Sequence, residues 1–210
     1  MTKVVTPSPK FITDGQIGKF QELLGARLRK SGLESGPVQR VLQSQGDAVV
    51  EDMLAAIRKR VEGVSNLIVR RVAVDRTRTP QEVLDATGRK QYVDRKMVDS
   101  MPRGKGEETD VYFFKPRPEA YSSGGLISDD RLEAEFEFHG LKPDPYAQAA
   151  VNEADPVFAD GHPNGTHWKN ADGKWYYVAF YRWYGGRGVD VGQGGDGWGG
   201  GWWFAGVVRK

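Results

Sequence analysis

Apolar residues recur every three or four positions through the first third of the chain, the spacing of amphipathic helices. The pattern predicts three helices, which begin near Asp14, Ser35 and Asp47. Gly32, Gly46 and the glycine at position 63 are predicted to end them, since glycine commonly follows the last turn of a helix. This part is therefore expected to be a three-helix unit.

The middle of the chain alternates between strand and helix signals. Asn66–Val74 and Asp110–Lys115 are rich in β-branched and aromatic residues and predict two strands. Between them, Thr79-Pro80-Gln81-Glu82 has the pattern of a capping box with proline in the first turn, which predicts a short helix that ends at Gly88. Residues 89–108 are charged and predict a loop.

The last third is predicted to hold two more helices and then a β-meander. Ser128 is expected to cap a helix that closes at Gly140, and Asp144-Pro145 to begin another that finishes before Pro156. From Thr166 onward, strands and glycine-rich turns alternate, and the final strand runs from Trp202 to Val208.

These elements predict an α+β fold: an N-terminal three-helix unit, a mixed region and a C-terminal antiparallel, aromatic-rich β-meander. The expected organisation is a flexible tail over residues 1–10, a helical domain over 11–64 and an α+β domain over 65–210. The composition changes most at the boundary near residue 64.

Composition narrows the function classes. The chain has no cysteine, which excludes disulfides and cysteine-based zinc sites, and its formal net charge is only +2. No stretch reaches the length of a membrane span, and no apolar run resembling a signal peptide follows the start. We expect a cytoplasmic protein with no cofactor and no membrane contact.

Aromatic residues gather at the C-terminal end, where alternate residues of one strand lie on opposite faces. One face carries Trp175, Tyr177, Ala179, Tyr181 and Trp183, and the other carries Tyr176, Val178, Phe180, Arg182 and Tyr184. The expected ligand-binding residues are those of the second face together with the tryptophan of a glycine-rich loop: Tyr176, Phe180, Arg182, Tyr184 and Trp198. The alternative is that both faces are buried and that Trp198 folds back onto the sheet.

A basic stretch between residues 58 and 90 suggests a nucleic-acid surface. Its candidate contact residues are arginines and one lysine: Arg58, Lys59, Arg60, Arg70, Arg76 and Arg78. The alternative is a solvated surface on which these cations pair with carboxylates. The charge balance of the two halves fits either interpretation, because residues 1–90 are net basic and residues 91–210 are net acidic.

Two of the three histidines lie in one segment, DGHPNGTHW, which favours a second hypothesis. Imidazole and carboxylate groups bind zinc, so Asp155, Asp160, His162 and His167 are candidate metal ligands, and Asp160, His162 and His167 candidate catalytic groups. The other interpretation is a structural turn, since Pro163, Asn164 and Gly165 are typical turn residues.

The segments DATGRKQYVD, GLKPDPYAQAAVNEADPVFADGHPNGTHWKNADGKWYY and WWFAGVVRK resemble an uncharacterised family of small bacterial proteins, typical of bacteria with reduced genomes. The resemblance implies a bacterial protein and brings no assigned activity. From the residues we expect a non-enzymatic binding or interaction protein that uses the aromatic sheet face and the Gly/Trp loop. Its expected partner is an unknown macromolecule, and nucleic acid is the leading specific candidate. The alternative is a hydrolase-like, metal-dependent enzyme centred on residues 155–167.

Overall fold

The computed structural model describes residues 12–209 and divides the chain into two compact units, Met1–Ser65 and Asn66–Lys210. The tail expected over residues 1–10 lies outside the described residues. The first unit consists of two helices, α1 (Asp14–Arg29) and α2 (Ser35–Glu62). Thr13 begins α1 with a capping box, because its hydroxyl accepts from the Gln16 amide and the Gln16 side chain bonds back.

The predicted helix break at Gly46 is wrong, so the unit has two helices among its described residues instead of three. Gly46 lies within α2, which runs through it for 28 residues. A glycine inside a helix costs only about 1 kcal/mol relative to alanine, and the good helix formers on both sides outweigh that cost. The glycine at position 63 does end the helix, as predicted.

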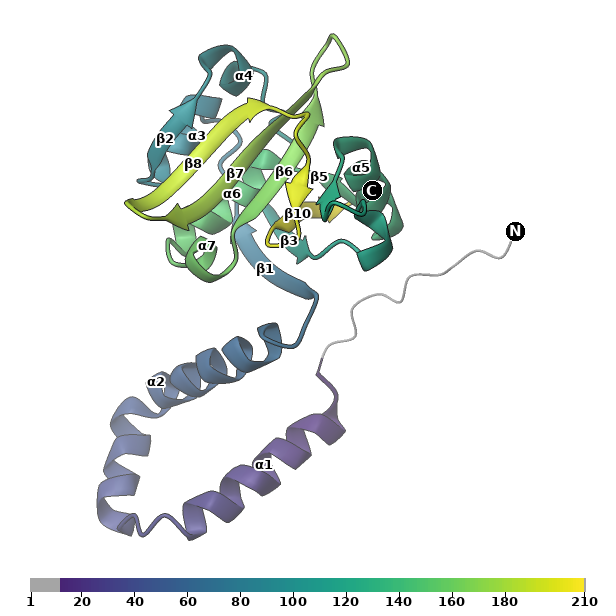
Figure 1. Ribbon diagram of the computed structural model, residues 1–210. Helices are drawn as coiled ribbons and strands as arrows, with labels where there is room; N and C mark the ends of the chain where they lie inside the picture. The colour runs from purple at the N-terminus through teal and green to yellow at the C-terminus, as the bar shows by residue number, and fades with distance from the viewer. Residues whose placement is uncertain (1–11, 210) are drawn as a thin grey trace. The chain divides into compact units, whose positions relative to one another are not determined.

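The second unit is built on one mixed sheet, with strands in the order β1-β3-β10-β6-β7-β8-β2 and β5 beside β10 (Figure 1). Its strands are β1 (Leu67–Ala73), β2 (Lys90–Val93), β3 (Glu108–Phe114), β5 (Leu141–Pro143), β6 (Asn164–Lys169), β7 (Trp175–Trp183), β8 (Gly186–Gln193) and β10 (Trp203–Val208). A separate two-stranded ribbon pairs β4 (Leu126–Ile127) with β9 (Trp198–Gly199). The α+β class is confirmed.

The helices of this unit are short, and most of them begin with an N-cap residue whose side chain accepts a hydrogen bond from a backbone amide of the first turn. They are α3 (Pro80–Ala86), α4 (Arg95–Asp99), α5 (Asp129–Phe138), α6 (Pro145–Ala154) and α7 (Phe158–Gly161), with a 3₁₀ turn at Pro118–Ala120. The predicted caps of α3, α5 and α6 are confirmed: the side chains of Thr79, Ser128 and Asp144 each accept from an amide in the first turn.

Two predictions about this unit are wrong. Residues 89–108 contain β2 and α4 and are not simply a loop, because β2 gains its order from a parallel pairing with β8, about 100 residues away in the chain. The last strand does not continue the meander. Strands β6, β7 and β8 form it, whereas β10 lies on the other side of β6, runs parallel to it and pairs antiparallel with β3.

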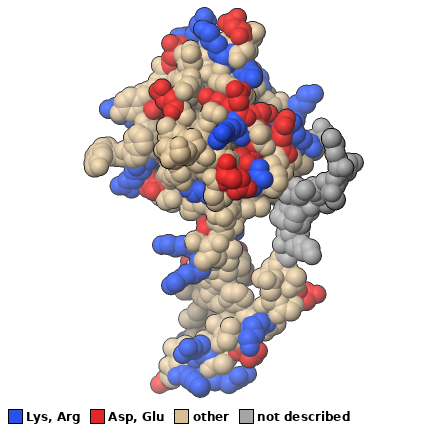
Figure 2. Space-filling model, turned by 45° about the vertical axis from the view of Figure 1, so that its right-hand side comes forward, with Lys and Arg blue, Asp and Glu red and all other residues tan. Residues whose placement is uncertain are grey.

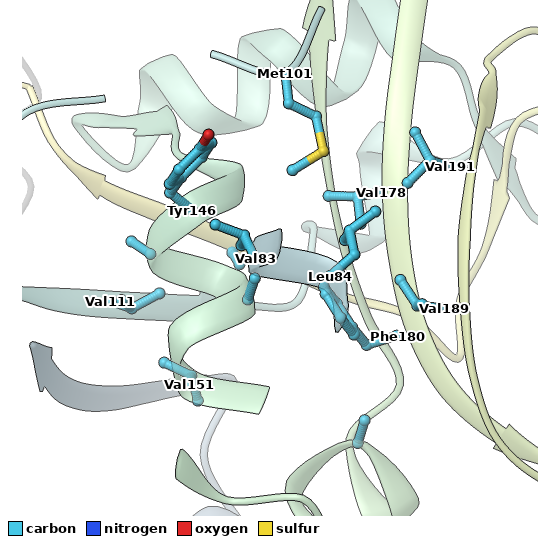
Figure 3. Close-up of a cluster of buried hydrophobic side chains, with 14 of the residues drawn as sticks. Val83, Leu84, Met101, Val111, Tyr146, Val151, Val178, Phe180, Val189 and Val191 are labelled. Atoms are coloured by element: carbon cyan, nitrogen blue, oxygen red, sulfur yellow. The ribbon is translucent and has the colours of Figure 1, made fainter. Parts of the chain in front are cut away.

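The two sheet faces pack against different partners. One face contacts α3, α4, α6 and α7, and Val178 and Phe180 point into this core beside Leu84, as Figure 3 shows. The other face packs against α5 and the β4–β9 ribbon through a second cluster that includes Phe136 and Trp198. Among the described residues, no helix is long and apolar enough to cross a membrane.

Candidate ligand-binding pocket

The sheet face that the sequence favoured for a ligand is the inner one. Tyr176 and Phe180 are 6% and 0% exposed, in the core beneath the helices, so neither is available as a stacking platform. Arg182 donates to Asp160, and Tyr184 is fully exposed at the β7–β8 turn. The expected platform is therefore wrong, because the helices cover the face that carries Tyr176 and Phe180.

The opposite face of β7 carries Tyr177, Ala179, Tyr181 and Trp183. Their β8 neighbours are Gly192, Asp190, Gly188 and Gly186. A Cβ atom at Gly188 would lie 2.7 Å from the Tyr181 ring, and one at Gly192 would lie 2.9 Å from the Tyr177 hydroxyl. The tyrosine rings thus lie directly over glycine backbone, an approach that a larger residue would block.

The glycine-rich loop after β8 closes this face. Trp198 is only 7% exposed, and its ring rests on Gly165 of β6, where a Cβ atom would come within 2.7 Å. Its indole N–H donates to Asp129 Oδ1 over 3.1 Å, and Trp202 meets its ring edge-on at 5.3 Å. Trp198 therefore folds back onto the sheet, the alternative that the sequence left open.

These elements enclose a pocket of about 200 Å³, which we call the aromatic pocket. Its lining combines rings, carboxylates and small residues: Tyr177, Ala179, Tyr181, Trp183, Asp190, Gln193, Gly194, Gly195, Asp196, Gly197, Trp198 and Trp202. It contains no lysine, arginine or histidine. Pockets for whole small molecules usually measure about 300–1,000 Å³, so this one suits a compact group.

Asp190 is the charged group on the floor of the aromatic pocket. It accepts a hydrogen bond from the Tyr181 hydroxyl over 2.7 Å, and burial raises its pKa. Burial also raises the pKa of Tyr181, so this hydroxyl stays a donor. Because the lining of the aromatic pocket includes no basic residue, neither Asp190 nor Asp196 has a cation beside it within the pocket, and the pocket carries uncompensated negative charge.

A buried network supports the Trp198 side of the pocket. His167 of β6 is fully buried, and its ring stacks on Trp175 at 4.2 Å. Its Nδ1 lies 3.2 Å from Asp129 Oδ1, and its Nε2 lies 3.3 Å from Glu133 Oε2. The hydrogen bond from His167 is the largest cause that lowers the pKa of Glu133. Asp129 thus holds both His167 and the Trp198 indole.

Sequence reasoning missed both carboxylates of this network. Asp129 and Glu133 are four residues apart at the start of α5, a spacing that places both on one side of the helix. That spacing was the available signal. Nothing in the sequence indicated that a histidine of β6 lies against this side.

The structure does not bring the predicted metal ligands together. His162 stacks on Phe158 at 5.0 Å, Asp155 accepts from the Val157 amide, and His167 belongs to the network with Asp129 and Glu133. The described part of the chain contains no group of three or more His, Cys, Asp or Glu that could hold a metal ion. The four predicted ligands therefore do not form one site among the described residues, because each has a separate set of partners.

Asp160, in α7, instead forms ion pairs with arginines of two neighbouring strands, β7 and β8. It accepts from Arg182 and Arg187 over 2.9 Å each, and these bonds lower its pKa to about 2. The Asp160 side chain is 20% exposed, whereas that of Arg182 is 58% exposed, so water screens part of the attraction.

We expect the ion pairs of Asp160 with Arg182 and Arg187 to make the free energy of unfolding depend on pH under acidic conditions. Because its folded-state pKa lies below the ordinary value of 3.8, the pair stabilises the fold fully above about pH 4 and loses this contribution as pH falls toward 2. Asp160→Asn should lower the free energy of unfolding by about 1 kcal/mol at pH 7. Urea denaturation of the native protein and of Asp160→Asn between pH 7 and 2.5 measures the difference in their free energies of unfolding. A difference that stays constant as the pH falls would contradict the assignment.

The predicted basic surface is largely paired within the α+β unit. Arg76 bonds Asp144 through both terminal nitrogens, Arg78 pairs with Glu153, and Arg70 lies over the Phe158 ring at 4.9 Å. On the face shown in Figure 2, acidic and basic side chains are interspersed over this unit. Arg58, Lys59 and Arg60 belong to α2 of the other unit. Binding to nucleic acid stays a prediction.

Comparison of the chain with protein-family models, with curated proteins and with solved structures finds no match. The resemblance to an uncharacterised bacterial family therefore stays a prediction.

Proposed function

We propose that this chain is a binding protein whose aromatic pocket holds the head group of an organic ammonium cation. The observation that carries the proposal is the lining: ring faces from both ends of β7 and from the Gly/Trp loop, two carboxylates, and no basic residue. The proposal keeps the Gly/Trp loop from the sequence prediction, with Trp198 folded onto the sheet, and uses the sheet face opposite to the one expected.

Ring faces attract cations because the π-system places negative charge above and below the ring plane. The contribution is about 0.5–1 kcal/mol for each exposed contact and about 2 kcal/mol or more when the site is dry. Methylated ammonium groups suit such a pocket, because their methyl groups contact rings while their charge needs little water. The small volume of the aromatic pocket fits a head group of this kind.

Asp190 supplies the second part of the recognition. Burial makes its charged form costly, which is why its pKa is raised. A cation beside it would offset that cost. Sugars and neutral flat ligands can also stack on aromatic rings, but they do not compensate the charge of a half-buried carboxylate. The pairing of rings with an uncompensated acid is what favours a cation.

Titration with choline and with its neutral carbon analogue, 3,3-dimethylbutan-1-ol, tests the proposal. The two have nearly the same shape and differ in charge. We expect choline to quench tryptophan fluorescence with a dissociation constant of about 0.1–1 mM, equivalent to about 4–5 kcal/mol, and the alcohol to bind at least about tenfold more weakly. Calorimetry gives an independent measure of both constants.

Two outcomes would overturn the proposal. Equal affinity for choline and the alcohol would mean that the aromatic pocket recognises apolar shape and not charge. No binding of either up to about 10 mM, a concentration at which a site of about 4 kcal/mol is mostly filled, would mean that it does not accept this class of ligand.

A further inference from the structure

A second hollow lies beside the aromatic pocket, at the end of the sheet where β7 turns into β8. Strand β8 lies between β7 and β2 (Figure 1), and its Gly188 pairs with both Tyr181 of β7 and Lys90 of β2. The hollow measures about 360 Å³, and we call it the turn groove. Glycines of the turn and of β8 line it together with six larger side chains: Lys90, Tyr92, Tyr181, Trp183, Tyr184 and Arg187.

The charge of this lining is opposite to that of the aromatic pocket. The turn groove has four aromatic rings, two cations and no carboxylate, whereas the aromatic pocket has two carboxylates and no cation. The lining of the turn groove also includes no Leu, Ile, Val or Met. Rings and cations without aliphatic side chains suit a ligand that is both flat and anionic.

The rings of the turn groove are open to solvent. Among the described residues of the α+β unit, the exposed aromatic side chains are Tyr92, Trp183 and Tyr184, and all three line this groove. Trp183 is 59% exposed although the Tyr181 ring lies 4.5 Å from it, and Tyr184 is fully exposed. A cluster of exposed rings on a unit that buries its other rings at least in part marks a contact surface.

Glycines keep space open between these rings. Tyr181 lies flat over β8, since a Cβ atom at Gly188 would come within 2.7 Å of its ring. Beside Gly185 and Gly186 of the turn, the position that a Cβ atom would occupy has no neighbouring atom within 4 Å. A flat group can therefore approach the backbone of the turn closely, next to Trp183.

Positive charge at this end of the sheet is only partly neutralised within the α+β unit. Asp160 is shared by Arg182 and Arg187, and Asp155 also attracts Arg187. Lys90 lies over an aromatic ring at 5.1 Å, a contact that leaves its charge uncompensated. An anionic partner would gain from this charge, because desolvated cations and the field they create favour anions.

We propose that the turn groove binds single-stranded nucleic acid. Bases would stack on Tyr92, Trp183 and Tyr184, while Lys90 and Arg182 attract the phosphates. Unpaired bases are required, because the bases of a duplex are already stacked on one another. The inference goes beyond the proposed ligand of the aromatic pocket and does not depend on it.

Two features favour a nucleic-acid strand over other anionic partners. A further hollow, lined by Arg182, Trp183, Tyr184 and the turn glycines, continues the groove past the turn, so there is room for more than one nucleotide. A membrane surface is the other anionic partner of this size. Segments that bind membranes bury aliphatic side chains among the lipid chains, and the turn groove has none.

Fluorescence anisotropy of labelled strands of about 20 nucleotides tests the proposal with the full chain. We expect oligothymidine and oligouridine to bind with dissociation constants of about 1–100 μM at about 50 mM salt, and the affinity to fall as salt rises. A duplex of the same length should bind at least about fivefold more weakly, since its bases cannot stack on the rings.

Three outcomes would overturn the proposal. One is the absence of single-strand binding up to about 1 mM, and another is duplex binding as tight as single-strand binding. The third is association with vesicles of phosphatidylserine and phosphatidylcholine without any binding of single strands, which would show that the groove faces a membrane.

Two substitutions of one exposed ring test the stacking. Tyr184→Ala removes a ring that is fully exposed, so the fold does not depend on it. It should weaken single-strand binding at least about fivefold, whereas Tyr184→Phe keeps the ring and should bind within about twofold of the native protein. Equal losses in the two variants would contradict stacking, because they differ in the ring and not in the hydroxyl group.

Lys90→Glu tests the charge, with Lys174→Glu as the matched control. Both lysines are exposed and the net charge changes equally, but Lys174 lies in the β6–β7 turn, outside the groove. We expect a loss of at least about tenfold for Lys90→Glu and of less than about threefold for Lys174→Glu. Choline binding should stay unchanged in both, since neither lysine lines the aromatic pocket. Equal losses of strand affinity would mean that overall charge, and not the turn groove, attracts the strand.

Discussion

Asp190→Asn is expected to weaken choline binding by about thirtyfold while leaving the fold intact. Two unit charges about 4 Å apart attract by about 4 kcal/mol in surroundings of intermediate polarity, and part of this is offset because the asparagine is easier to bury. A net loss of about 2 kcal/mol corresponds to the thirtyfold change. The Tyr181 hydroxyl can still donate to the new amide oxygen, so its hydrogen bond is kept.

The affinity for choline should also depend on pH. Because burial raises the pKa of Asp190 above the ordinary aspartate value of 3.8, its carboxylate takes up a proton at a higher pH than an ordinary aspartate does. Choline affinity of the native protein should therefore begin to fall while other carboxylates are still charged. The Asp190→Asn variant should have low affinity that does not change over this range.

Asp172→Asn is the matched control, because Asp172 lies in the exposed β6–β7 turn and does not line the aromatic pocket. It makes the same change of net charge. If it lowered choline affinity as much as Asp190→Asn does, the effect would come from the overall field of the protein. Native-like affinity of Asp190→Asn would show that rings alone hold the ligand.

Local chemistry made much of the fold predictable. The side chains of Thr79, Ser128 and Asp144 each accept a hydrogen bond from the amide three residues later. A short sequence pattern therefore contains both partners of the interaction. The strands of the meander are joined by short turns, and their pairing was predictable for the same reason. The places of β2 and β10 depend on partners far along the chain, which no local pattern specifies.

The candidate site was predictable only in part. Alternation along β7 correctly divided its side chains into two sets, but it could not say which set faces the helices. The choice depends on α3, α6 and their neighbours, which cover Tyr176 and Phe180. No sequence pattern indicated Asp190, because a single aspartate in a strand becomes unusual only when the tyrosines of the neighbouring strand are known to lie over glycines on either side of it.

His167→Ala is expected to have the largest effect on stability of any single change considered. The ring lies between the carboxylates of Asp129 and Glu133 and is fully buried, so its loss leaves two acids without their shared partner. Losing a fully buried aromatic ring together with its hydrogen bonds costs about 3–5 kcal/mol. For a chain of this size, such a loss lowers the melting temperature by roughly 6–20 °C. Urea denaturation measures the loss in free energy of unfolding, and thermal denaturation measures the change in melting temperature.

His162→Ala is the comparison variant, because His162 also stacks on an aromatic ring, that of Phe158, but does not bridge Asp129 and Glu133. It should cost about 1–2 kcal/mol. Adding Asp129→Asn to His167→Ala should recover part of the lost stability, since a neutral amide is easier to bury than a carboxylate that has lost a hydrogen bond. Glu133 is left unchanged because it also pairs with Arg209. Equal losses in the two histidine variants would mean that His167 acts only by filling space.

The pH dependence of the His167→Ala effect separates charge from packing. The hydrogen bond from His167 lowers the pKa of Glu133, so its contribution is complete above pH 4.5 and is lost as pH falls through the lower folded-state value. The gap between native and variant should therefore narrow below pH 4.5. Because Asp129 also holds the Trp198 indole, the variant should bind choline more weakly as well. A gap that stays constant with pH, together with unchanged choline affinity, would separate this network from the aromatic pocket.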